Sequence, residues 1–212
     1  MTDPIAPPFS ADVEFALAHV PATSQRAMTS LWTLDATLGN IVATTTQPLV
    51  GQLRLTWWHE ALSGLGTDTV NGEPVLDALA NDVIAGGRIE TAALARLGEG
   101  WEVLLEPMPL ERGVIEAYAD HRGVMFDLSA VILGAPSDRD AGRGWALSEF
   151  ALRCSDDVTA GRAWDLADLA LSTARISALP RSLRSLARLA EADCALRTRA
   201  ERSLWRRLRS LR

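Results

Sequence analysis

The chain has 212 residues, 48% of them hydrophobic, which is enough for one substantial core, so we expect a single domain over residues 1–212. No run of eighteen apolar residues occurs, and Met1 to Pro8 contains neither a basic nor an apolar segment, so the sequence predicts neither a membrane-spanning helix nor an export signal. Cys154 and Cys194 lack metal-type spacing and imply no disulfide framework. We therefore expect a cytoplasmic protein.

Charge is unevenly distributed along the chain. All 21 basic residues are arginine. Residues 1–180 carry 11 Arg against 24 Asp and Glu, a net charge of −13, whereas residues 181–212 carry 10 Arg against three acids, a net charge of +7. The acidic body disfavours nucleic-acid binding, and the arginine-rich end could contact an anionic membrane surface, an acidic protein partner or the body itself.

Helical periodicity dominates the sequence, and alternation typical of strands is absent, so the predicted fold class is all-α. Residues 1–11 are expected to be flexible. Glycines and prolines separate the apolar periodic segments, which predict helices over residues 24–46, 50–63, 74–85, 90–105, 110–133, 138–154, 164–179 and 180–212.

The last of these segments has two interpretations. Its leucines approximate an apolar stripe with arginines beside it: Leu183, Leu186, Leu189, Leu204, Leu208 and Leu211. A basic amphipathic helix of this kind can lie in an anionic membrane surface. Packing of the stripe against the acidic body is the favoured interpretation, because the apolar stripe is needed for a core.

Few residues suggest chemistry by themselves. His19, His59 and His121 are far apart and have no second ligand at helical spacing, so no zinc site is predicted. Two acidic pairs, Asp156 with Asp157 and Asp165 with Asp168, could contribute to a Mg²⁺-diphosphate site. Helix capping and first-turn preferences are the favoured explanation of both pairs, so neither pair alone predicts a metal site.

Four segments together resemble the squalene/phytoene synthase family. They are Leu31–Ala36, Gln52–Leu62 with the doublet Trp57-Trp58, Pro107–Ala119, and Gly142–Arg153. The resemblance implies a helical bundle of the isoprenoid synthase type, in which two facing helices present aspartates. It also implies Mg²⁺-dependent condensation of prenyl diphosphates, because hard Mg²⁺ ions held by carboxylates neutralise the diphosphate leaving group.

The aspartate positions depart from the family pattern. The first motif reads Gly39-Asn40-Ile41-Val42-Ala43, so Gly39, Asn40 and Ala43 offer no carboxylate. In the second motif Cys154 aligns with the first expected aspartate, and Asp156 and Asp157 could be a remnant that partly substitutes. Such a sequence is similar to the aspartate-lacking family members of the complex I assembly type, and no cofactor is expected.

Three functions follow from these observations. The leading hypothesis is a pseudoenzyme with an assembly or scaffolding role, peripheral on the inner membrane, that uses Arg181–Arg212 to contact a protein partner or anionic lipid. The alternative is a prenyl transferase acting on farnesyl or geranylgeranyl diphosphate with a degenerate Mg²⁺ site of Asp156, Asp157 and either Asp35 or Asp127. The third is a carrier of an apolar isoprenoid ligand.

Overall fold

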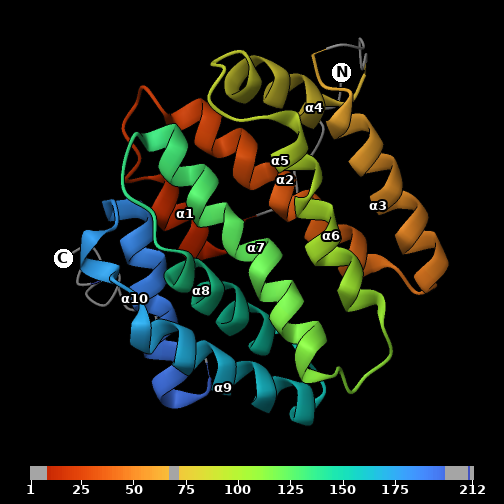
Figure 1. The fold of residues 1–212 in the computed structure, drawn as a ribbon, viewed down its shortest axis with the longest axis vertical. Coiled ribbons are helices and arrows are strands. Elements are labelled where there is room, and N and C mark those ends of the chain that lie inside the picture. The colour runs from red at the N-terminus through yellow and green to blue at the C-terminus, as the bar shows by residue number, and fades with distance from the viewer. Residues whose placement is uncertain (1–8, 67–71, 199–209, 211–212) are drawn as a thin grey trace.

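The structure, a computed structural model, describes residues 9–66, 72–198 and 210, and these contain helices and no strand (Figure 1). This confirms the predicted all-α fold class. The helices are α1 (Ala11–Leu17), α2 (Gln25–Thr44), α3 (Pro48–Ser63), α4 (Pro74–Leu79), the π-helical turn η1 (Ala80–Ile84), α5 (Thr91–Ala95), α6 (Leu97–Glu102), the 3₁₀ turn η2 (Val103–Leu105), α7 (Arg112–Leu133), α8 (Arg139–Ala151), α9 (Asp157–Thr173), the 3₁₀ turn η3 (Ile176–Ala178) and α10 (Arg181–Leu196).

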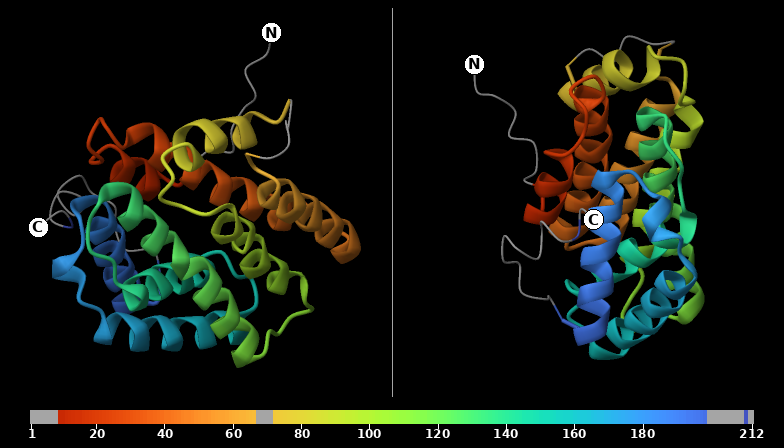
Figure 2. Two further views of the ribbon diagram at one scale, coloured as in Figure 1. Left: turned by 45° about the horizontal axis from the view of Figure 1, so that its top comes forward. Right: turned by 90° about the vertical axis from the view of Figure 1, so that its left-hand side faces the viewer.

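The helices form two groups around a continuous core. α8 is at the centre of one group and packs against α7, α9 and α10, while α1 closes this group by packing along α10 (Figures 1 and 2). In the other group α2 contacts α3, α4 and α6, and α3 lies at the outer edge of the molecule. The two groups meet through buried side chains of both, such as Leu38, Phe126 and Leu183.

Helix starts are fixed by side chains that accept hydrogen bonds from free backbone N–H groups. Ser10 caps α1 by accepting from Val13 N at 3.3 Å, and Asp138 caps α8 by accepting from Ala141 N at 2.9 Å. The second carboxylate oxygen of Asp138 accepts from Arg175 N at 3.0 Å. One aspartate therefore joins the start of α8 to the segment that follows α9.

Close packing of α7 on α8 depends on glycine. A Cβ atom added at Gly142 would lie 2.5 Å from the carbonyl oxygen of Gly123, so any side chain there would push the two helices apart. This crossing fixes α8 against α7 and thereby sets the position of the α8 C-terminal turn, which contributes to the site described below.

The sequence prediction differs from the structure in the bounds of α9 and in the absence of α1. The prediction of a helix over 164–179 is wrong at its start, because Asp156 caps a helix that begins at Asp157, and wrong at its end, because Ala174 is extended. The short helix α1, starting at Ala11, is not predicted at all, since seven residues carry too little periodicity to recognise.

The predicted continuous helix over 180–212 is wrong at Arg197. This residue adopts a left-handed conformation with φ of 48°, and its N–H donates to the carbonyl of Cys194, which ends α10 at Leu196. Leu183, Leu186 and Leu189 are buried against the body of the protein. The predicted second half of the stripe, at Leu204, Leu208 and Leu211, and the N-terminal residues 1–8 lie outside the described residues.

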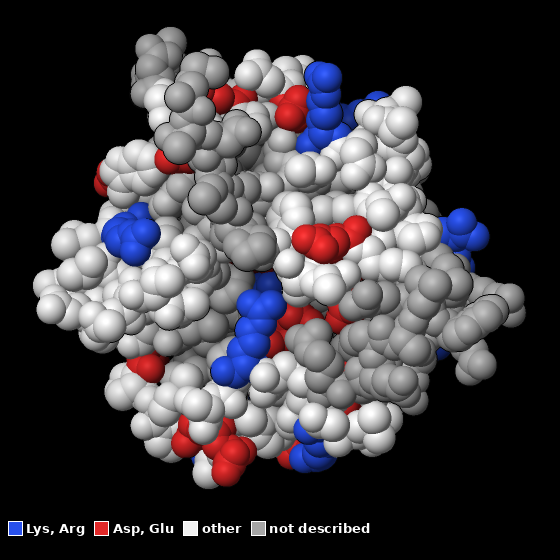
Figure 3. All heavy atoms as spheres, turned by 180° about the vertical axis from the view of Figure 1, so that it is seen from behind, with Lys and Arg blue, Asp and Glu red and all other residues white. Residues whose placement is uncertain are grey.

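No helix in the described part of the chain is both long enough and apolar enough to cross a bilayer. On the face seen in Figure 3, basic and acidic side chains are interspersed among uncharged ones. Several of the charged side chains are paired across elements, as in Arg143 with Asp120 at 3.0 Å and Arg139 with Asp127 at 2.7 Å.

Candidate functional site

A small cavity, here called the polar cleft, lies where α1, α2, α7 and α8 meet. It has a volume of about 210 Å³. It is lined by Phe9, Ser10, Val13, Trp32, Asp35, Ala36, Gly39, Asn40, Ala43, Trp101, Arg122, Trp145, Glu149 and Arg153. All three residues named from the first aspartate motif, Gly39, Asn40 and Ala43, therefore line the same cavity as Glu149 and Arg153 at the end of α8.

A buried ion pair forms the base of the cleft. Arg122 on α7 donates to both carboxylate oxygens of Asp35 on α2, at 3.1 and 2.9 Å, and to the hydroxyl of Tyr118 at 2.7 Å. Both charged side chains are less than a tenth exposed. Such a two-point contact holds guanidinium and carboxylate in one plane and satisfies most of their hydrogen-bonding capacity.

Aromatic rings enclose this ion pair. The guanidinium of Arg122 lies 4.6 Å from the ring centre of Trp101 and 4.4 Å from that of Trp145, so it is stacked between two indoles. Burial acts against its charge, but attraction by Asp35 prevails and raises the pKa of Arg122 above its usual value. Burial also raises the pKa of Tyr118, although Arg122 acts in the opposite direction. Arg122 is therefore cationic and Tyr118 neutral throughout the physiological range.

The space beside Gly39 of the first motif is occupied by the ring of Trp101. A Cβ atom at Gly39 would lie 2.8 Å from Cη2 of Trp101, a contact that real structures essentially never show. The same indole donates its Nε1–H to Asp35 at 3.2 Å, which fixes its orientation. A side chain of any kind, and a carboxylate in particular, has no space at this point of α2.

The second-motif region offers a different arrangement from the one predicted. Glu149 and Arg153, one turn apart at the end of α8, form an ion pair at 3.1 Å beside the cleft. Asp156 accepts from Thr159 N at 2.7 Å as the cap of α9, and hydrogen bonding by the side chain and then the backbone N–H of Thr159 lowers the pKa of Asp156. Neither Asp156 nor its neighbour Asp157 lines the cleft. The structure thus does not bring these two aspartates to the first-motif residues.

The remaining predicted acids are also held in local contacts. Asp127 accepts from Ser137 and from Arg139, the latter at 2.7 Å, and does not line the cleft. Asp165 pairs with Arg197. Because α9 begins at Asp157, Asp165 and Asp168 lie beyond its first turn, and the first-turn interpretation of this pair is wrong.

The side chains of the cleft do not fit a Mg²⁺-diphosphate centre. Among the described residues no group of three or more His, Cys, Asp or Glu side chains could hold a metal ion together. The acidic side chains that line the cleft, Asp35 and Glu149, each contact an arginine, so the charges of the cleft are balanced within the protein. Mg²⁺ retains its hydration shell unless carboxylates or phosphates replace it.

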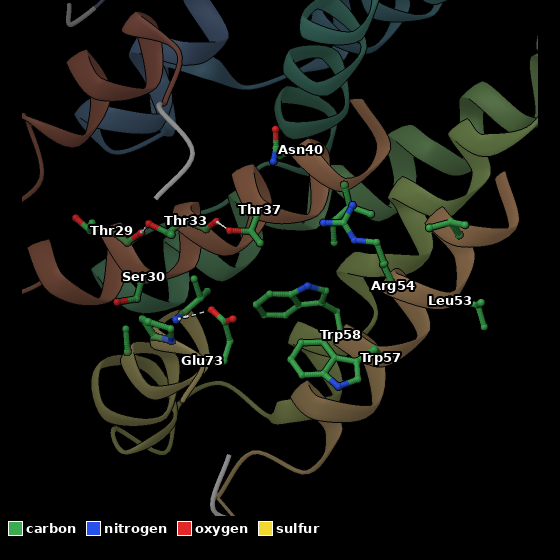
Figure 4. Close-up of a pocket in the computed structure, with 15 residues that line it drawn as sticks. Thr29, Ser30, Thr33, Thr37, Asn40, Leu53, Arg54, Trp57, Trp58 and Glu73 are labelled. Carbon is green, nitrogen blue, oxygen red and sulfur yellow. Dashed lines mark hydrogen bonds between the residues drawn. The ribbon is translucent and has the colours of Figure 1, made fainter. Parts of the chain in front are cut away.

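A larger cavity, here called the apolar groove, lies on a neighbouring face of α2 and shares Asn40 with the polar cleft. Its volume is about 850 Å³. α2, α3 and α4 line it with Thr29, Ser30, Thr33, Thr37, Asn40, Ile41, Val50, Leu53, Arg54, Trp57, Trp58, Glu73, Pro74, Val75 and Ala78. Figure 4 shows the Trp57 and Trp58 rings across from the row of α2 threonines, with Glu73 on a third side.

Sequence reasoning missed the residues that define the polar cleft, above all Arg122 and Trp101. A signal was present, because Arg122 is a charged residue inside the otherwise apolar buried face of the predicted helix 110–133. Such a residue requires a buried partner of opposite charge, and Asp35 was the nearest candidate in the predicted helix 24–46. Asp35 and Arg122 are 87 residues apart in the sequence, so their pairing can be recognised only in the folded structure.

Comparison with known proteins gives one family. The family model for squalene/phytoene synthase matches residues 9–166, which is well over half of the chain and includes both halves of the polar cleft. No curated protein and no solved structure is a significant match. The match agrees with the all-α fold, and the matched residues include the Trp57-Trp58 doublet. The chain belongs to the squalene/phytoene synthase family.

Proposed function

We propose that this chain is a non-catalytic member of the squalene/phytoene synthase family, with an assembly or scaffolding role. The observation that supports it most directly is the Trp101 ring, which fills the space beside Gly39 where the first motif would present a carboxylate. Asp35, the neighbouring acid, is held by Arg122 instead.

Charge and size both argue against catalysis in the polar cleft. Loss of diphosphate from a prenyl chain requires metal ions to neutralise the leaving group, and the cleft supplies paired carboxylates only. Its volume of about 210 Å³ is also smaller than the roughly 300–1,000 Å³ typical of small-molecule sites. Two prenyl diphosphates have no room there.

The scaffolding role is proposed for the arginine-rich segment 181–212, in contact with an acidic protein or with anionic lipid at the inner membrane. In α10 Leu183, Leu186 and Leu189 face the core, whereas the exposed side carries Arg181 and Arg188, with Leu196 exposed at the last position of the helix. A polar, arginine-bearing surface favours electrostatic contact over insertion of an apolar face.

The test of catalytic silence is calorimetric titration with farnesyl and geranylgeranyl diphosphate, with and without Mg²⁺, beside an active family member. We expect no Mg²⁺-dependent heat and no prenyl product. Mg²⁺-dependent binding together with formation of a prenyl product, both lost in Asp156→Asn/Asp157→Asn and kept in the surface control Asp165→Asn, would establish the prenyl transferase instead.

The contact surface is tested by sedimentation with vesicles of neutral lipid and of neutral lipid mixed with anionic lipid. We expect binding to the anionic vesicles only, weakened by salt and by Arg181→Gln/Arg188→Gln. Equal sedimentation with both vesicle types would contradict an electrostatic contact with anionic lipid. An acidic protein partner would then be tested.

A further inference from the structure

The apolar groove is more apolar than its residue types suggest. Three of its polar side chains are already engaged: Thr33 and Thr37 donate to the carbonyls of Thr29 and Thr33, each at 2.8 Å, and Ser30 donates to Asp82 at 2.9 Å. These hydroxyls turn toward their own helix or a neighbouring acid, so α2 presents mainly methyl groups to the cavity.

The two charged residues of the groove differ in their contacts. The carboxylate of Glu73 accepts from Val75 N at 3.2 Å and caps α4. Arg54 is exposed, and no hydrogen bond or ion pair to it occurs among the described residues. Figure 4 shows Glu73 and Arg54 at different sides of the cavity. The groove therefore has an available cation on one side only.

The rim of the groove is unusually apolar for a protein surface. Val50, Leu53 and Trp57 on α3 are 45, 63 and 48% exposed, and all three line the cavity. Large apolar side chains gathered at one exposed cavity mark a binding surface. The volume of about 850 Å³ is also within the range of about 300–1,000 Å³ found for small-molecule sites.

From these observations we propose that the apolar groove binds a single-chain amphiphile with an anionic head. Its hydrocarbon chain lies against Trp57, Trp58, Ile41 and Val75, and its carboxylate or phosphate is bound by Arg54, away from Glu73. This site is on a different face of α2 from the polar cleft and requires no metal ion, so it goes beyond the proposed non-catalytic role.

The experiment is calorimetric titration of the full chain in EDTA with oleate, oleyl phosphate, oleyl alcohol, oleylamine and inorganic phosphate, each below its aggregation concentration. We expect one site for the two anionic probes. Oleyl alcohol should bind about tenfold more weakly, since it lacks the charge-assisted contact with Arg54. A preference for oleyl phosphate over oleate would assign a phosphate-headed lipid, and a preference for oleate a fatty acid.

Paired variants locate the binding. Arg54→Gln should reduce the affinity for the anionic probes to that for the alcohol and leave the alcohol unchanged, whereas Arg26→Gln, on the exposed first turn of α2, should alter neither. Ala78→Phe should weaken the binding of oleate, oleyl phosphate and oleyl alcohol because its ring fills part of the groove. Ala92→Phe, at an exposed position of α5, should not.

Several results would overturn the proposal: no binding of any oleyl probe, inorganic phosphate binding as tightly as oleyl phosphate, tighter binding of oleylamine, or binding unaffected by Ala78→Phe. Because the titrations contain EDTA, their failure is separate from that of the catalytic test, which depends on Mg²⁺.

Discussion

Arg122 is the side chain whose contacts form the base of the polar cleft. It is buried, bonded to Asp35 and Tyr118, and stacked between Trp101 and Trp145. A buried arginine of this kind stabilises the fold only while its partner is present, because each charge alone would be desolvated without compensation. The pair therefore joins α2 to α7 at the base of the polar cleft.

Removing one partner tests this. We expect Arg122→Met to lower the free energy of unfolding by about 3–5 kcal/mol, because Asp35 is left buried and unpaired. The double variant Asp35→Asn/Arg122→Met, in which the introduced amide oxygen would still accept from Trp101, should recover a large part of that loss. Urea unfolding of the four proteins of the cycle measures the coupling, and simple additivity would show that the pair contributes little.

Gly39 gives a second prediction. Alanine usually stabilises a helix by about 1 kcal/mol relative to glycine, but at Gly39 the added methyl meets Trp101 at 2.8 Å. We expect Gly39→Ala to destabilise by about 1–3 kcal/mol through overpacking, and Gly39→Asp by more. Gly161 in α9 has open space around it, so Gly161→Ala should stabilise the protein in the same urea assay. Stabilisation by both substitutions would mean that Trp101 yields readily.

The sequence alone shows that the first motif lacks carboxylates, but it does not show which side chains lie beside the motif in the folded protein. The missing carboxylates at Gly39, Asn40 and Ala43 can be read directly from a motif alignment. The contacts of Trp101 and Arg122 with Asp35 cannot, because neither residue is near the motif in sequence and each is explained only by contacts between α2, α6 and α7.

At the scale of the helices, the start of α9 depends on the cap residue Asp156. The sequence allows Asp156 to be either a metal ligand or a cap, and its carboxylate accepts from Thr159 N. The seven residues between the true start and the predicted start at Trp164 are weakly apolar, so their periodicity gives no helix signal. The end of α10 has an equivalent explanation, since nothing in the sequence around Arg197 indicates a positive φ.

The cap at Asp156 makes a prediction about pH. Hydrogen bonds from Thr159 lower the pKa of Asp156 from the usual 3.8. The folded state therefore favours the carboxylate, and its stabilising effect is complete above pH 3.8 and is lost as pH falls through the lowered pKa. Asp156→Asn keeps a neutral cap, so its stability relative to wild type should be lower at pH 6 and approach it at acidic pH. A difference independent of pH in thermal unfolding would contradict this assignment.

For the whole molecule, α10 is part of the core and not an appendage. Leu183 and Leu186 are at most 2% exposed, and α10 packs on α1, α8 and α9. The full chain should therefore unfold cooperatively, as judged by circular dichroism and calorimetry. A chain ending at Leu179 should lose that transition, since it removes the cover of α1 and α8. Cooperative unfolding of the shorter chain would show that α10 is dispensable.

The all-α class, most helix positions and the family follow from periodicity and the tryptophan doublet, because local patterns encode them. The apolar groove is only partly predictable. The sequence suggests an apolar ligand in a central cavity, whereas the structure places the larger cavity between α2, α3 and α4. Its walls come from three helices whose relative placement depends on contacts distant in sequence.

The exposure of Trp57 has a spectroscopic consequence. Of the described tryptophans, Trp32, Trp58, Trp101, Trp145 and Trp164 are all less than a tenth exposed, whereas Trp57 is 48% exposed at the rim of the groove. Among these six, emission that iodide can quench should therefore come mainly from Trp57. The protein thus carries an intrinsic optical reporter of its own groove, which occupancy should shield from the quencher without any added label.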